Sequence, residues 1–129
     1  MGKKKALIIT DGSRSARTTA LLIKQSLADY RVKICPAKRF MGNDLLPMDL
    51  FFIGCKKPKP KTFLYLSQLL AHINLASKKC GLFGLTEKTI KYLTLICADS
   101  EVSYGEPLLA GEDITQEAVN KWLKNVIKP

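Results

Sequence analysis

The sequence has little of what a metal site, a disulfide framework or a membrane span requires. It contains one histidine and four cysteines, and no two cysteines form a C-x-x-C pair, so the usual ligand spacing of a zinc site is missing. All four cysteines lie in or beside apolar runs, which is typical of small buried thiols. No apolar run approaches the length that crosses a bilayer. These features predict no metal, no membrane and a cytoplasmic location.

Acidic residues are also scarce, and they do not form a catalytic pattern. The chain has 11 Asp and Glu against 21 Lys and Arg, a net charge of +10. No paired carboxylates and no Ser-His-Asp set are visible, and the sole histidine, His72, lies between Leu70 and Ile73 in a predicted helix. We therefore predict no catalytic residue. The positive charge favours an anionic partner, although no nucleic-acid recognition motif accompanies it.

The 129 residues fit one α/β domain, residues 1–129. Short apolar runs predict strands, and apolar residues at helical spacing predict the helices between them. The predicted strands cover residues 5–10, 31–36, 50–55, 80–85 and 102–110. The predicted helices follow residue 15, cover 62–75, follow Thr86 and follow Thr115. Such alternation predicts a doubly wound, five-stranded parallel sheet with helices on both faces.

Two prolines indicate the order of these strands. Pro36 ends the second predicted strand and Pro107 lies within the fifth. Because proline cannot donate to a sheet ladder, both strands are expected at edges. The first, third and fourth strands read as continuous apolar runs and are expected at the centre. The order 2-1-3-4-5 meets both demands, and it predicts a ligand crevice where strands one and three end.

Two loops reach that crevice, and they supply the candidate ligand-binding residues. The first loop, residues 10–18, leads into a predicted helix, whose N-terminal N–H groups favour an anion. Plain N-capping by Ser13 or Ser15 is the alternative. The second loop, residues 56–61, is a rigid basic segment that we call the basic loop. The candidate cofactor-binding residues are Ser13, Arg14, Ser15, Ala16, Arg17, Thr18, Gly54, Cys55, Lys56 and Lys57.

Residues 12–18 resemble the phosphate loop of the flavodoxin family, usually written S/T-x-T-G-N-T. Ser13, Ser15 and Thr18 match its hydroxyl positions, while Ala16 and Arg17 replace its glycine and asparagine. The order of elements along nearly the whole chain is also similar, as are Phe52-Ile53-Gly54 and Gly105-Glu106-Pro107-Leu108. The resemblance implies a flavodoxin-like fold, FMN as cofactor, and electron transfer to a redox partner protein.

Two hypotheses about function stay open, because the aromatic residues are not where a flavin needs them. Flavodoxins usually hold the flavin ring between aromatic side chains of the loops after strands three and four. Residues 54–61 and 84–88 contain no aromatic residue, and Tyr104 is the remaining candidate. The first hypothesis is a divergent FMN-binding electron-transfer protein. The second is a flavin-free module of the same fold that binds an anionic ligand or a protein partner.

Overall fold

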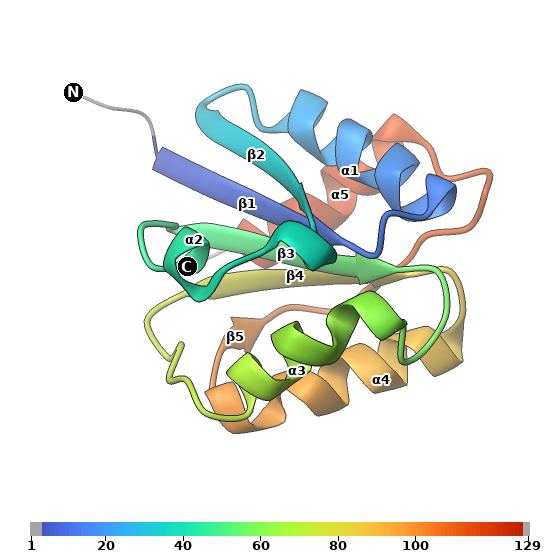
Figure 1. Cartoon of the computed structure of the whole chain (residues 1–129). Coiled ribbons are helices and arrows are strands. Elements are labelled where there is room, and N and C mark those ends of the chain that lie inside the picture. Colours follow the sequence, from blue (N-terminus) through green and yellow to red (C-terminus); the bar gives the residue numbers. More distant parts are fainter. Residues whose placement is uncertain (1–3, 128–129) are drawn as a thin grey trace.

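The computed structural model describes residues 4–127, which form a parallel sheet with helices on both faces (Figure 1). The strands are β1 (Lys4–Thr10), β2 (Tyr30–Pro36), β3 (Leu50–Cys55), β4 (Lys79–Gly84), β5 (Ser103–Tyr104) and β6 (Leu108–Leu109). Their order is β2-β1-β3-β4-β5, and β6 also pairs with β4. The predicted order 2-1-3-4-5 is therefore confirmed.

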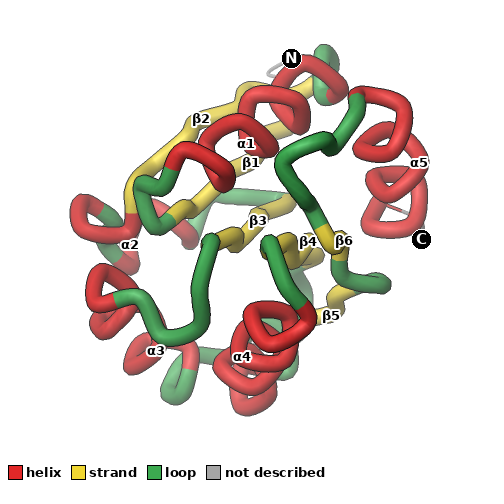
Figure 2. Tube along the Cα trace, turned by 90° about the vertical axis from the view of Figure 1, so that its right-hand side faces the viewer, coloured by secondary structure: helices red, strands yellow, loops and turns green. Residues whose placement is uncertain are grey.

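Within residues 4–127, five α-helices and three 3₁₀ turns accompany these strands, and α5 follows the last of them. The helices are α1 (Arg14–Ser26), α2 (Gly42–Leu45), α3 (Leu64–Leu70), α4 (Glu87–Cys97) and α5 (Gln116–Ile127). The 3₁₀ turns are Ala37–Arg39, Lys61–Phe63 and Ala98–Ser100. Helices α1 and α5 cover one face of the sheet, whereas α2, α3 and α4 lie on the other (Figure 2). Within residues 4–127, no helix combines the length and the apolar character that crossing a membrane requires.

Alternation along β1 explains why its sequence reads as a continuous apolar run. Leu7 and Ile9 pack into the cluster that includes Leu66 of α3 and Leu93 of α4. Ala6 and Ile8 pack into the opposite cluster, with residues of α1 and α5. Successive side chains of a strand point to opposite faces, so a sheet covered on both sides needs apolar residues at every position.

The predicted fifth strand, residues 102–110, is wrong as a continuous element. It divides into β5 and β6, two short strands that both pair in parallel with β4. Pro107 lies in the break between them and has no N–H for a ladder. The Glu106 carbonyl accepts a hydrogen bond from Trp122 Nε1 at 2.8 Å, so this segment bonds to α5 instead of to a neighbouring strand.

The predicted helix 62–75 is also shorter than its apolar pattern indicates. A 3₁₀ turn, Lys61–Phe63, precedes α3, and α3 itself ends at Leu70. Phe63, the last residue of this turn, is fully buried. His72 lies exposed in the turn after α3, and residues 4–127 contain no cluster of His, Cys, Asp and Glu that could hold a metal ion.

Candidate functional site

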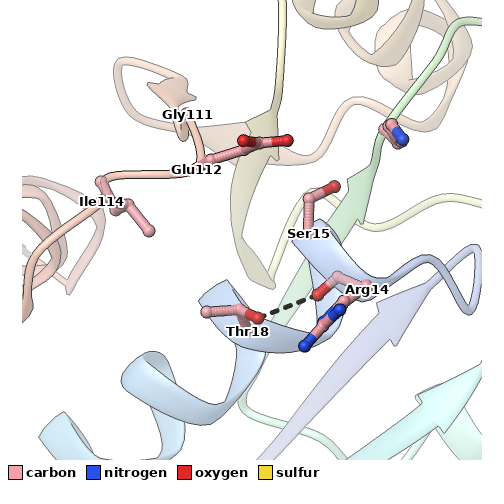
Figure 3. Close-up of a pocket in the computed structure, with 7 residues that line it drawn as sticks. Arg14, Ser15, Thr18, Gly111, Glu112 and Ile114 are labelled. Carbon is pink, nitrogen blue, oxygen red and sulfur yellow. Dashed lines mark hydrogen bonds between the residues drawn. The ribbon is translucent and has the colours of Figure 1, made fainter.

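A pocket of about 340 Å³ lies where β1, β3 and β6 end, at the carboxyl edge of the sheet. We call it the α1 pocket. Figure 3 shows that Ser15 and Thr18 of α1 face the segment between β6 and α5, which carries Glu112 and Ile114. The full lining is Arg14, Ser15, Thr18, Lys56, Gly111, Glu112 and Ile114. The volume lies at the lower end of the range for small-ligand sites.

The first turn of α1 forms one wall of this pocket. Ser13 is the N-cap, and its Oγ accepts a hydrogen bond from the Ala16 N–H at 3.3 Å. Residues from Arg14 onward are therefore helical, and the N–H groups of Arg14 and Ser15 have no acceptor within the helix. The capping alternative is thus confirmed for Ser13, and it leaves these two N–H groups for an anion. The Thr18 hydroxyl does not cap the helix, since it donates a hydrogen bond to the Arg14 carbonyl at 3.0 Å.

Asp11, which the sequence analysis did not assign to the site, organises the loop before α1. Its Oδ1 accepts from the Ser13 N–H at 3.0 Å and from the Ser13 hydroxyl at 2.6 Å. Its Oδ2 accepts from the Lys56 N–H at 3.1 Å. Asp11 therefore joins the loop after β1 to the loop after β3. The signal for the local part of this role is the Asp-Gly-Ser sequence, since aspartate commonly bonds the backbone two residues ahead.

The backbone of Lys56 is held at both its N–H and its carbonyl. While Asp11 accepts from the Lys56 N–H, the Lys56 carbonyl accepts from the Thr89 hydroxyl at 3.0 Å. Thr89 is fully buried, and its Oγ1 also lies 3.1 Å from the Oγ1 of Thr86, the N-cap of α4. Three segments at the carboxyl edge are therefore fixed to one another. The start of the basic loop is preorganised, but its Lys56 N–H is committed to an internal carboxylate.

The charges in the pocket leave a small positive excess. Arg14 and Lys56 contribute two cationic side chains, and Glu112 contributes one carboxylate. Glu112 and the rest of the segment after β6 were not among the residues predicted for the site. The topology could have indicated that this segment belongs to the site, because it follows the carboxyl end of the last strand of the sheet. The carboxyl ends of parallel strands meet at one edge, where ligands of such folds bind.

Four predicted candidates line the α1 pocket and six do not. Arg14, Ser15, Thr18 and Lys56 come together there. Ala16 is buried in the core, and Arg17 and Lys57 are exposed outside the lining. The remaining three, Ser13, Gly54 and Cys55, hold the structure beside the pocket without lining it.

Gly54 and Cys55, at the end of β3, have structural roles beside the pocket. A Cβ on Gly54 would lie 2.0 Å from the ring of Phe83, so the ring crosses the strand only because no side chain is there. Cys55 is buried, and this burial raises the pKa of its thiol to about 12, with the Asp11 carboxylate adding to the shift. The thiol is therefore neutral near pH 7 and unsuited to act as a nucleophile.

The residues around the pocket fit a phosphate group better than they fit a flavin ring. The pocket lining within residues 4–127 contains no aromatic side chain. The connection from β4 to α4 consists of Leu85 and Thr86 alone, which leaves little chain to present a stacking ring. Tyr104 pairs with Cys80, four residues before the end of β4, so it lies about 13 Å from the carboxyl edge at about 3.3 Å per residue.

Comparisons with solved structures find flavodoxins over nearly the full chain. A short-chain flavodoxin associated with a non-canonical PDU bacterial microcompartment gives a TM-score of 0.83 at 14% identity, covering 98% of each chain. The flavodoxin of Streptococcus pneumoniae TIGR4 gives 0.76 at 14% identity, covering 95% of this chain and 96% of its own. Flavodoxin 2 from Bacillus cereus gives 0.74 at 19% identity, covering 91% and 93%. No family model and no curated protein sequence matches. The fold is therefore flavodoxin-like.

Proposed function

We propose that this protein binds a phosphate-bearing ligand in the α1 pocket, with FMN as that ligand, and passes electrons to a redox partner protein. The observation that carries the proposal is that Arg14, Lys56 and the N-terminus of α1 meet at one pocket. This pocket lies at the crevice of the sheet, where ligands of doubly wound folds bind. The flavodoxin-like fold supports FMN as the first ligand to test, and bound FMN would supply one- or two-electron chemistry.

In this proposal, the protein's own residues act on the phosphate end of the ligand. The Arg14 guanidinium and the Lys56 ammonium offset its charge, and the free N–H groups of Arg14 and Ser15 donate to its oxygens. Glu112 lies across the pocket (Figure 3) and opposes the same charge. We therefore expect weaker FMN binding than in flavodoxins that also stack the ring between aromatic side chains.

Titration of the protein with FMN, followed by flavin fluorescence, tests this proposal. Saturable binding is expected, and salt should weaken it by screening the charges. The double variant Arg14→Ala/Ser15→Ala removes one charge-assisted contact, worth about 1.5–3 kcal/mol, together with a hydroxyl. It should weaken binding at least about tenfold, because 1.4 kcal/mol corresponds to that factor. Arg17→Ala is the matched control, since Arg17 lies on the same helix but outside the pocket.

A second candidate function, a flavin-free module that binds an anionic ligand or a protein, is favoured by a different observation. The connection between β4 and α4 contains two residues, and no aromatic side chain lines the α1 pocket within residues 4–127. A comparison of FMN with inorganic phosphate as ligands separates the two candidate functions. If phosphate binds and the Arg14→Ala/Ser15→Ala variant loses it, while FMN binds no better than phosphate, the flavin-free function holds. If neither FMN nor phosphate gives saturable binding, both forms of the proposal fail.

A further inference from the structure

A second and larger hollow, about 630 Å³, lies between α3 and α4 on the other face of the sheet from α1. We call it the α3–α4 groove. The two helices that form it lie side by side in Figure 1. Leu64 of α3 and Tyr92, Leu95 and Ile96 of α4 provide most of its apolar surface. None of these residues takes part in the α1 pocket.

The groove carries the two most exposed large apolar side chains of residues 4–127. Leu95 is 74% exposed and Leu64 is 64% exposed. Single exposed leucines are ordinary on protein surfaces. Two of them lining one hollow, beside the half-buried side chains of Tyr92 and Ile96, make a continuous apolar surface of the kind that marks interaction sites.

Positive charge borders this apolar surface. Lys59 and Lys61 of the basic loop line the groove, and no acidic residue belongs to its described lining. Lys59 has a φ of 53°, and it lies between Pro58 and Pro60. A left-handed backbone costs energy for a residue with a side chain, and the flanking prolines restrict the chain around it. The ammonium groups therefore extend from a stiff backbone, which reduces the entropy lost when a partner binds.

We propose that the α3–α4 groove docks an acidic amphipathic segment of a partner protein. Apolar side chains of that segment would cover Leu64 and Leu95, and its carboxylates would lie against Lys59 and Lys61. Charge complementarity selects this occupant over a second copy of the chain. A second copy would bring the same lysines and a net charge of +10 to the contact, and like charges that face each other disfavour binding.

Two synthetic amphipathic peptides test the proposal with the whole protein. One has leucine on one helical face and glutamate on the other, and its partner peptide has lysine in place of glutamate. Fluorescence anisotropy of labelled peptide measures binding, and amide shifts in a ¹H–¹⁵N spectrum locate it. The glutamate peptide should bind with a Kd below about 1 mM, with the largest shifts at Ser67 and Ile96. The lysine peptide should not bind.

Three variants identify the contacts. Leu95→Ser should weaken the glutamate peptide at least about fivefold, because burial of one leucine by the peptide is lost. Lys61→Gln should weaken it less and should reduce its salt dependence. Leu21→Ser is the matched control, since Leu21 is 46% exposed on α1, away from the groove. Leu95 and Leu21 are both exposed, so both variants should keep the thermal unfolding midpoint of the parent protein.

Each other result would overturn the inference. No saturable binding of the glutamate peptide, equal binding of the two peptides, or equal loss in Leu95→Ser and Leu21→Ser would each exclude an acidic docking groove. Binding to phosphatidylserine vesicles that Leu95→Ser abolishes, without peptide binding, would assign the groove to a membrane surface. Concentration-dependent dimerisation that Leu95→Ser abolishes would assign it to a second copy. These measurements use no flavin, so they succeed or fail independently of FMN binding.

Discussion

Replacing Asp11 with alanine should loosen the carboxyl edge of the sheet, because one carboxylate there joins two loops. The Asp11→Ala substitution removes three hydrogen bonds: two from Ser13 and one from the N–H of Lys56, 45 residues away. Bonds to a charged group contribute about 1.5–3 kcal/mol each. The two Ser13 bonds are local, and the groups involved are partly exposed, so water replaces part of what is lost. We expect a loss of about 2–3 kcal/mol in the free energy of unfolding.

The assay is urea unfolding at pH 7, with thermal unfolding as a second measure. For a chain of this size, about 1 kcal/mol corresponds to roughly 4 °C in Tm, so Asp11→Ala should unfold about 8–12 °C lower. The Tm of Asp11→Asn should lie between that of the parent protein and that of Asp11→Ala. Its amide oxygen can still accept from Ser13, but its NH₂ group cannot accept from the Lys56 N–H.

Lys56→Ala separates the role of the Lys56 backbone from that of its side chain. The substitution keeps the N–H that bonds to Asp11, so its stability should stay within about 0.5 kcal/mol of the parent protein. A loss in Asp11→Ala below about 0.5 kcal/mol would refute the reasoning, because the carboxylate would then not hold the loops together. A large loss in Lys56→Ala would show that the ammonium charge, rather than the backbone bond, stabilises this edge.

Three further predictions concern the interior. Gly54→Ala should destabilise the protein by about 1–3 kcal/mol in urea unfolding, since the new Cβ would lie 2.0 Å from the Phe83 ring. An unchanged urea midpoint would show that the Phe83 ring can move to another rotamer without cost. Burial raises the pKa of Cys55 from 9.0 and that of Tyr92 from 10.0, both to about 12. The unfolded chain therefore loses these protons first, so the contribution of these two groups to stability should be constant below about pH 9 and should be lost between about pH 9 and 12. Urea midpoints measured over this alkaline range in a reducing buffer would show the loss. All four cysteines are buried free thiols, so a thiol reagent should react slowly with native protein and find four thiols after non-reducing denaturation; a count of two would indicate a disulfide.

The fold could be predicted because its signals are local and repeated. Each central strand is an apolar run, and Pro36 marks the end of an edge strand in both the sequence and the structure. The helix starts were also visible in the sequence, because a Ser or Thr stands before each of three helical patterns. In the structure, Ser13, Thr86 and Thr115 each accept a hydrogen bond from the N–H three residues ahead. Pro107 indicated that this segment could not donate a full ladder. The division into β5 and β6 was still missed, because the bond that holds the segment between them, from Trp122 to the Glu106 carbonyl, is a distant contact.

The site could be predicted only in part, because its residues depend on contacts between loops. The candidates on α1 were found since they follow β1 directly. Glu112 was missed because it enters the pocket from a segment nearly 100 residues later, and the role of Asp11 was missed because half of it depends on Lys56. Where α1 begins also mattered. With Ser13 as its N-cap, residues 14–18 form helix rather than an open loop, and Arg17 consequently lies outside the pocket.

The basic loop connects the two surfaces to which we assign partners. Lys56 lines the α1 pocket, while Lys59 and Lys61 line the α3–α4 groove. The Cα atoms of Lys56 and Lys59 can lie at most about 11 Å apart, because three residues of extended chain reach no further. The loop is anchored by Asp11 and Thr89 at its start, and its two prolines restrict its backbone. A ligand in the pocket and an acidic segment in the groove would then lie close together on one rigid stretch of chain. That proximity is what transfer of electrons from a bound cofactor to a docked partner requires, and it makes the two proposals physically compatible although each is tested alone.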